Sequence, residues 1–320
     1  MLHPRVATVG EVGERGLLQL ISRYASAHLG DDGAVLEFNS PSQALVVTTD
    51  MLVEEVHFSD RTTSAMDVGW RAAAANLSDL AAMGAMPWSL TIALGMPAHT
   101  PLTWVEGFYQ GFSACLQTYG GEIVGGDLVR ADTRQVAVTA LGRVQPDRLI
   151  QRSTAQVGDA ILISGSHGRS RAGLELLLQP HLTQYLNLEQ IHDFYQAHQR
   201  PVPRFDLIER LTELPPTQVS GMDSSDGLGD AISQICAASK VGAKLDWINM
   251  PIPSGIGAIA PETYGDWIIN GGEDFELVLT LDRAIAQQLC ELLPSAAIIG
   301  EIVAEPGIFG LELGQSFQHF

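Results

Sequence analysis

Seven short acidic segments are distributed along this 320-residue chain, and most of them lie beside glycine or serine. They are Gly30-Asp31-Asp32-Gly33, Thr48-Thr49-Asp50, Glu54-Glu55 near His57, Asn76-Leu77-Ser78-Asp79, Gly125-Gly126-Asp127, Asp223-Ser224-Ser225-Asp226-Gly227 and Gly271-Gly272-Glu273-Asp274. Small neighbours let the backbone turn sharply and let a ligand approach closely. Carboxylate and hydroxyl oxygens suit Mg²⁺ rather than zinc or copper. The pattern therefore predicts a site for several Mg²⁺ ions, and the usual reason for such a site is a polyphosphate.

Each acidic segment also has an ordinary structural explanation when it is taken alone. Asp226 precedes a helix, where aspartate is a common N-cap, and the segment that ends at Asp127 could be a β-turn. His57 alone is more typical of a surface or core histidine. Asp79 favours a ligand role, because a buried carboxylate within an alanine-rich helix needs a partner or a metal ion. The prediction of a metal site therefore depends on the number of segments together.

The sequence lacks the phosphate-binding motifs of the common kinases. The chain contains neither a Gly-x-x-x-x-Gly-Lys-Ser/Thr loop nor the set of motifs that marks protein kinases. Arg130, Arg143 and Arg152 are candidates for phosphate contact, because a guanidinium binds phosphate in a fork. The alternative for any one of them is a surface salt bridge.

Composition narrows the class of protein. The net charge of −19 argues against nucleic acid and against an anionic membrane surface as partners. Three isolated cysteines indicate neither a disulfide framework nor a zinc site. The segment from Met1 to Gly16 lacks the apolar stretch of a signal peptide. We expect a cytoplasmic protein with a sizeable core, since 46% of the residues are hydrophobic and 17% are charged.

The elements that must position these residues are expected in two domains, because 320 residues exceed the size of one ordinary core. The predicted bounds are 1–149 and 150–320, since the chain turns polar near Pro146. The expected elements of the first are a helix at 15–27, a buried strand at 45–49 that delivers Asp50 at its end, a helix at 66–83 that begins after Ser64, and a strand at 122–124 that leads into the Gly-Gly-Asp segment. In that helix Asn76 and Asp79 should share one face. In the second domain, a strand at 219–223 and a helix at 228–239 should flank the Asp-Ser-Ser-Asp turn.

Read in order, the segments resemble one known family over nearly the whole chain. They are LGDDGAV, VVTTDMLVEEVHF, AAANLSDLAAMGAMPWSLTIAL, IVGGDLVRAD, SGSHGRSRAGLELL, MDSSDGL, GGEDFELVLT and the closing SFQHF. The series is similar to the thiamine-monophosphate kinases, within the aminoimidazole-ribonucleotide-synthetase-like superfamily. The resemblance implies direct transfer of the ATP γ-phosphoryl group to thiamine monophosphate, with no covalent nucleophile on the enzyme. It also implies an α/β and α+β, two-domain synthetase-like fold, whose N-terminal α/β domain forms a homodimer through its strands and whose C-terminal domain is α+β.

The resemblance also implies roles for individual residues. The Mg²⁺ ligands would be Asp31, Thr48, Thr49, Asp50, Asp79, Asp127, Asp223 and Asp226. The ATP contacts would be Tyr109, Gly126, Asp127, Arg152 and Ser225, and the thiamine phosphate contacts would be His57, Glu273 and Phe317. One departure from the family pattern is Leu128-Val129, which stands where threonines usually follow Gly-Gly-Asp.

Four alternative functions can be compared with the sequence, and two of them lack a residue that they would need. Selenophosphate synthetase would need a reactive cysteine near the N-terminus, but none precedes Cys115, and the hydrogenase-maturation dehydratase would need a C-terminal cysteine where this chain has Phe320. Aminoimidazole ribonucleotide synthetase is the runner-up, because it uses ATP and Mg²⁺ on a similar scaffold. A non-catalytic nucleotide- or thiamine-phosphate-binding dimer is the alternative outside enzymes, and the intact carboxylate set argues against it.

Overall fold

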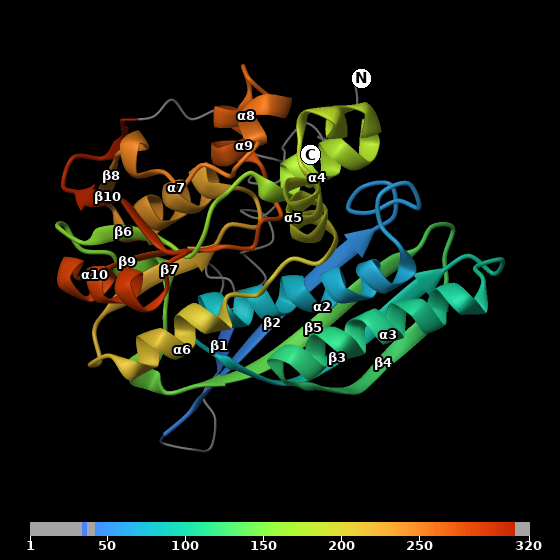
Figure 1. Cartoon of the computed structure of the whole chain (residues 1–320). Coiled ribbons are helices and arrows are strands. Elements are labelled where there is room, and N and C mark those ends of the chain that lie inside the picture. The colour runs from blue at the N-terminus through green and yellow to red at the C-terminus, as the bar shows by residue number, and fades with distance from the viewer. Residues whose placement is uncertain (1–33, 37–41, 311–320) are drawn as a thin grey trace, which may run out of the picture.

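The computed structural model describes residues 34–36 and 42–310 (Figure 1). It contains a five-stranded sheet from the N-terminal half and a six-stranded sheet from the C-terminal half, with helices on both. This architecture confirms the predicted combination of α/β and α+β structure. The expected helix at 15–27, together with Asp31 and Phe317, lies outside the described residues.

The N-terminal sheet has the strand order β1-β2-β5-β3-β4, and all neighbours are antiparallel except β3 and β4. Two helices lie across one face of this sheet (Figure 1). The alternating burial of β5, with Val136, Val138 and Ala140 inside, is what a strand with one covered face should show. The elements are β1 (Ala34–Leu36), β2 (Ala44–Val53), α2 (Ala65–Ala82), β3 (Met86–Met96), α3 (Leu102–Tyr119), β4 (Glu122–Arg130) and β5 (Gln135–Val144).

The C-terminal sheet has the strand order β11-β8-β10-β6-β9-β7. Its strands are β6 (Ala160–Ile163), β7 (Val219–Asp223), β8 (Gly242–Leu245), β9 (Leu277–Leu281), β10 (Ala297–Val303) and β11 (Gly307–Phe309). Its helices are α4 (Arg169–Leu178), α5 (Leu188–Gln199), α6 (Phe205–Glu213), α7 (Leu228–Ser239), α8 (Ile256–Ile259), α9 (Tyr264–Asn270) and α10 (Arg283–Leu292), and 3-10 turns occur at η1 (Pro146–Arg148), η2 (Arg152–Thr154), η3 (Pro180–Tyr185) and η4 (Trp247–Asn249).

Strand β6 is buried on both faces, and each face belongs to a different part of the core. Ile161 and Ile163 pack with apolar residues of α4, α7 and α9. Leu162 faces the other way, into a cluster that also contains residues of α6, α10, α2 and the N-terminal sheet. The larger core is therefore continuous from one sheet to the other, and α2 lies within it.

Helix α2 is buried along nearly its whole length, and it begins as the sequence predicts. Ser64 is the N-cap, and its hydroxyl accepts a hydrogen bond from the backbone N–H of Asp67 at 3.3 Å. The alanines at 72–75 let neighbouring elements approach on every side. None of the described helices is both long and apolar enough to cross a membrane.

Two local predictions were wrong, for the same reason. Strand β2 does not end before Asp50 but continues to Val53, because its backbone pairs with β5 from Ala44 to Val53. The Gly125-Gly126-Asp127 segment is not a turn but lies within β4, where it pairs with β3 in parallel register. In both places tertiary strand pairing overrides the turn preference of glycine and aspartate.

The close packing of α2 against α3 depends on two glycines. A Cβ atom on Gly111 would lie 1.7 Å from the carbonyl oxygen of Met66, and one on Gly69 would lie 1.9 Å from that of Phe108. Distances this short require the two helix backbones to move apart. The helix pair is therefore specific for glycine at both positions.

We expect Gly111→Ala to lower the free energy of unfolding by about 1–3 kcal/mol, because separation of the helices opens the core more than alanine's helix propensity offsets. Gly257→Ala is the matched control, since a Cβ there would meet nothing within 4 Å. Urea unfolding measures both. A Gly111→Ala variant as stable as the wild type would contradict the close packing.

Candidate active site

A cavity of about 420 Å³ lies where α2 and the end of β2 meet the loops of the C-terminal half. Five of the residues predicted from the sequence line it, namely Asp50, His57, Ser225, Asp226 and Glu273. They come from three separate segments of the chain. The structure thus brings together part of the predicted set at one hollow.

Two carboxylates beside this cavity repel one another. Burial, and secondarily the charge of Asp223, raise the pKa of Asp50 from 3.8 to about 6. Burial also raises the pKa of Asp223, although a hydrogen bond from the Ser78 hydroxyl at 2.7 Å and the charge of Arg152 act in the opposite direction. The pair therefore carries negative charge in a place that disfavours it.

One oxygen of this pair has an unfilled hydrogen-bonding capacity. Asp223 is 1% exposed, its Oδ2 accepts from Ser78, and its Oδ1 has no hydrogen-bond partner in the described structure. A buried carboxylate oxygen without a partner is unfavourable unless a cation contacts it. The donor set suits Mg²⁺, which is held in proteins by one or two carboxylates while water and phosphate supply its other ligands. Among the residues in 34–36 and 42–310, no three His, Cys, Asp or Glu side chains are gathered as a metal site by themselves.

Helix α2 holds β2 in place beside these carboxylates. The Thr48 hydroxyl donates to Asp79 Oδ2, and Asn76 Oδ1 accepts from the backbone N–H of Asp50 at 3.1 Å. The prediction that Asn76 and Asp79 share a helical face is confirmed, since both contact β2. Thr48 and Asp79 are thus each given a polar partner within the protein.

His57 has one ring nitrogen occupied by the backbone. Its Nδ1 accepts a hydrogen bond from the N–H of Val53 at 3.0 Å. In the neutral ring the proton is therefore on Nε2. A histidine in this tautomer can donate a hydrogen bond from Nε2 to an anion.

Arg152 lies close to Asp223 without lining the cavity. Its Nη1 donates to Gln234 Oε1 at 2.5 Å, and its carbonyl oxygen accepts from the hydroxyls of Ser220 at 2.9 Å and Ser239 at 2.8 Å. Its charge lowers the pKa of Asp223. The two serine hydroxyls hold the backbone of Arg152 and Gln234 contacts its guanidinium, so the positive charge reaches Asp223 from the C-terminal half.

Four predicted residues lie away from the cavity. The Thr49 hydroxyl donates to the carbonyl oxygen of Val138 at 2.8 Å, and Tyr109 packs edge-on against Phe108 on α3 with ring centroids 5.2 Å apart. Gly126 and Asp127 lie on β4, the edge strand, which β5 and β3 separate from β2. Within a single chain, this structure does not bring Gly126 or Asp127 to Asp50.

Two residues near Glu273 were missed by the sequence reasoning. Arg71 on α2 forms an ion pair with Glu273, Nη2 to Oε1 at 2.5 Å, and His198 on α5 contacts Arg71. Arg71 carried a usable signal, because it is a charged residue next to an alanine run in a helix predicted to be buried. Nothing in the local sequence around His198 marks it.

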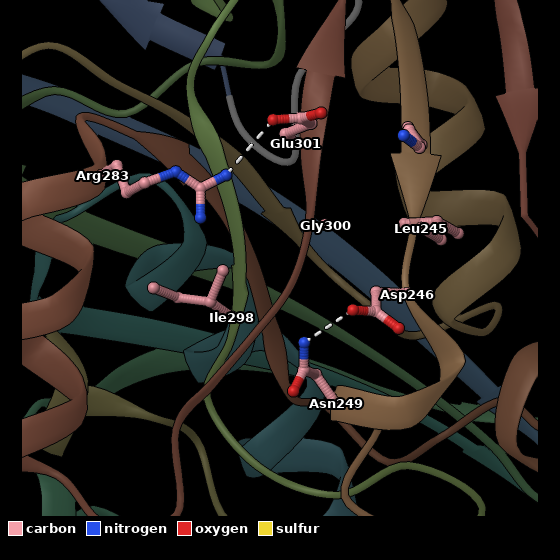
Figure 2. A pocket seen from close by; sticks show the side chains of 8 residues that line it. Leu245, Asp246, Asn249, Arg283, Ile298, Gly300 and Glu301 are labelled. Carbon is pink, nitrogen blue, oxygen red and sulfur yellow. Dashed lines mark hydrogen bonds and ion pairs between the residues drawn. The ribbon is translucent and has the colours of Figure 1, made fainter.

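A second cavity, of about 380 Å³, lies at β8 and β10 in the C-terminal sheet (Figure 2). Two polar pairs lie in its wall: Arg283 with Glu301 at 3.4 Å, and Asp246 with the side-chain amide of Asn249 at 2.8 Å. None of the predicted site residues lines it. Its lining contains two basic side chains, Lys244 and Arg283, and two acidic ones, Asp246 and Glu301, whereas Asp50 and Asp223 form a pair of like charge.

The chain is similar to proteins of known activity. Residues 30–144 match the family described as AIR synthase related protein, N-terminal domain. A thiamine-monophosphate kinase of Synechococcus elongatus is 45% identical over 328 residues, which cover 98% of each chain, and one of Prochlorococcus marinus is 36% identical over 320 residues, which cover 96% of this chain and 93% of that one. The solved structure of AaThiL complexed with AMPPCP and TMP has a TM-score of 0.87 and 30% identity, and the match covers 99% of this chain and all of the other.

The raised pKa of Asp50 predicts a dependence of stability on pH in metal-free protein. Because the carboxyl has a higher pKa folded, about 6, than unfolded, 3.8, stability is fully present below the unfolded pKa and is lost as pH rises through the folded one. Asp50→Asn should remove this loss and unfold with a free energy roughly 1–3 kcal/mol higher than the wild type at pH 8, but not at pH 4. Urea unfolding with a chelator measures it.

Glu262→Gln is the control for this experiment, because Glu262 is an exposed carboxylate outside both sheets and should change stability by no more than about 0.5 kcal/mol. If Asp50→Asn were no more stable than the wild type at pH 8, the carboxylate pair would not be strained in the folded protein.

Proposed function

The chain belongs to the thiamine-monophosphate kinase family and transfers a phosphoryl group from ATP to thiamine monophosphate, and we propose that it does so at the cavity lined by Asp50, His57 and Glu273. The products are thiamine diphosphate and ADP. The observation that carries the location is that three distant segments predicted to bind these substrates line one hollow.

We propose that Mg²⁺ is held by Asp50 and Asp223, with Asp226 on the cavity wall beside them. The unpartnered oxygen of Asp223 and the raised pKa of Asp50 support this assignment. When bound there, Mg²⁺ would supply positive charge between the carboxylates and the phosphate oxygens. Thr48 and Asp79 would keep β2 in place, and Asp31 is the further ligand that the family resemblance implies.

The residues of the site act by positioning and by electrostatics. The acceptor is an ionised phosphate, so no strong base is needed to activate it, and the main barrier is repulsion between two anions. His57 would donate from Nε2 to a phosphate oxygen, since Nδ1 is already occupied. Arg152 and Ser225 would contact ATP from the C-terminal half. No covalent enzyme intermediate forms in this scheme.

We propose that the division at 149/150 separates an ATP- and Mg²⁺-binding, dimer-forming part from an α+β part. The first sheet ends at Val144 and the second begins at Ala160, with only 3-10 turns between them. A cytoplasmic location belongs to the same proposal, because ATP is the phosphoryl donor.

We propose further that the protein is a homodimer in which β4 of each chain faces the other. All nine residues of β4 are exposed, among them Ile123, Val124, Leu128 and Val129. An exposed apolar edge strand is usually covered by a partner.

Three strand spacings, about 14 Å, separate β4 from β2, which is too far for Asp127 to share an ion with Asp50. Asp127, Gly126 and Tyr109 would then serve the partner chain's ATP.

Purified protein with ATP, Mg²⁺ and thiamine monophosphate should release ADP and form thiamine diphosphate in equal amounts. Asp223→Ala should lower kcat at least about 1,000-fold with the fold intact, because an ion ligand is lost. Glu262→Ala, an exposed carboxylate, is the control and should keep full activity. A coupled ADP assay measures turnover, and aminoimidazole ribonucleotide synthetase activity is tested in parallel. Undiminished turnover by Asp223→Ala would contradict the assignment.

Mixing two inactive variants tests whether Asp127 acts across the dimer. After subunit exchange, Asp127→Ala with Asp223→Ala should recover about a quarter of wild-type activity, because half the dimers are mixed and each has one intact site. Size-exclusion chromatography with a tagged subunit verifies exchange. No recovery in verified mixed dimers would mean that Asp127 does not serve the partner's site.

A further inference from the structure

Glu273 is placed at the cavity by an unusual backbone conformation. Its φ of 65° lies in the left-handed region, and its N–H donates to the carbonyl oxygen of Ser225 at 2.7 Å. The residue belongs to no helix or strand, and its side chain is 30% exposed. Without a partner the carboxylate could rotate among several conformations, so its direction depends on what contacts it.

Arg71 supplies that contact from a rigid element. Its side chain is 2% exposed within α2, and its Nη2 forms the 2.5 Å ion pair with Glu273 Oε1. Arg71 itself does not line the cavity, whereas Glu273, His198 and Ser170 do. The guanidinium therefore lies behind the carboxylate as seen from the cavity and can affect a ligand only through it.

His198 fixes Arg71 in turn. Arg71 Nη1 lies 3.1 Å from His198 Nε2, and since a guanidinium only donates, Nε2 is the acceptor. The ring proton is then on Nδ1, which donates to Ser170 Oγ at 3.2 Å. Burial, followed by the charge of Arg71, lowers the pKa of His198 to about 4, so the ring is neutral. The series of side-chain contacts that links Ser170, His198, Arg71 and Glu273 therefore has one consistent set of donors and acceptors.

The state of Glu273 follows from these contacts. Burial acts to raise its pKa, but the charge of Arg71 and the hydrogen bond from its guanidinium hold the pKa below its usual value. An ionised carboxylate at the wall of a cavity repels phosphate and attracts a cation. The thiazolium ring of thiamine is a cation, whereas its phosphate is not.

We propose that Arg71 is a positioning residue that directs Glu273 at the cationic ring of thiamine monophosphate, and that His198 holds Arg71 in that position. The inference rests on the proposed function of this cavity and adds what distinguishes the substrate: its ring charge. The alternative is that Arg71 and Glu273 form a buried salt bridge that contributes only to the stability of the fold.

The test compares thiamine monophosphate with 3-deazathiamine monophosphate, a neutral analogue of the same shape. The wild type should prefer the cationic substrate by at least about tenfold in kcat/KM. Glu273→Gln and Arg71→Met should each reduce that ratio to near one, and the double variant should reduce it no further. Calorimetric binding of the two compounds to each variant gives the same ratio without turnover. A purely structural role would lower activity toward both compounds equally and leave the ratio unchanged.

Paired substitutions keep the test decisive if Arg71→Met fails to fold. His198→Gln retains an acceptor for Arg71 and should preserve most of the preference, whereas His198→Leu removes the acceptor and should lose most of it. Arg169→Met is the matched control, because Arg169 pairs with Asp193 outside the cavity and should leave the ratio unchanged.

The outcomes separate this inference from the proposed function. A wild type that phosphorylates neither compound would overturn the function. A wild type active on both without preference would overturn the whole inference about the ring charge but not the proposed function. A preference that survives Arg71→Met and His198→Leu would overturn the role of Arg71 and His198.

Discussion

A buried helix must satisfy every polar side chain that it carries, and in α2 this requirement joins the two halves of the molecule. Asp79 and Asn76 bond to β2 of the first sheet, whereas Ser78 bonds to Asp223 of the second and Arg71 to Glu273. Each of these contacts removes an unpaired buried group. Because Asp50, Asp223 and Glu273 are among these partners, the packing of one helix also sets their relative positions.

The sequence was informative where local physics decides the outcome. The spacing of Asn76 and Asp79 places them on one helical face in any α-helix, and Ser64 caps the helix whatever packs against it. It failed at Gly125-Gly126-Asp127, whose turn-forming residues lie in a strand because β3 pairs with them. No local pattern could reveal that His198 reaches Arg71, 127 positions away.

The fold also explains why a residue that the sequence predicts for the site can lie away from it in a single chain. Asp50 and Asp223 meet because α2 bonds to the segments that carry both. Asp127 has no comparable link among the described residues, since its side chain only accepts from the N–H of Leu128 at 2.9 Å. Its strand is the exposed edge of the sheet, and in the proposed homodimer a second chain would supply further contacts.

The buried carboxylates at the two ends of the cavity differ in how their charge is compensated, and this difference matches the two ends of thiamine monophosphate. At Asp50 and Asp223, burial raises the pKa of both carboxyls, that of Asp223 in spite of the Ser78 hydroxyl and the charge of Arg152, and in the proposed function a bound cation would offset their charge. At Glu273 the compensating charge is built in, because Arg71 is fixed in the core. A single guanidinium keeps that carboxylate ionised while leaving its exposed side able to attract a ring cation. Under the proposed function, the first end would be completed by Mg²⁺ and the phosphates, whereas the carboxylate at the second end is already oriented by its ion pair.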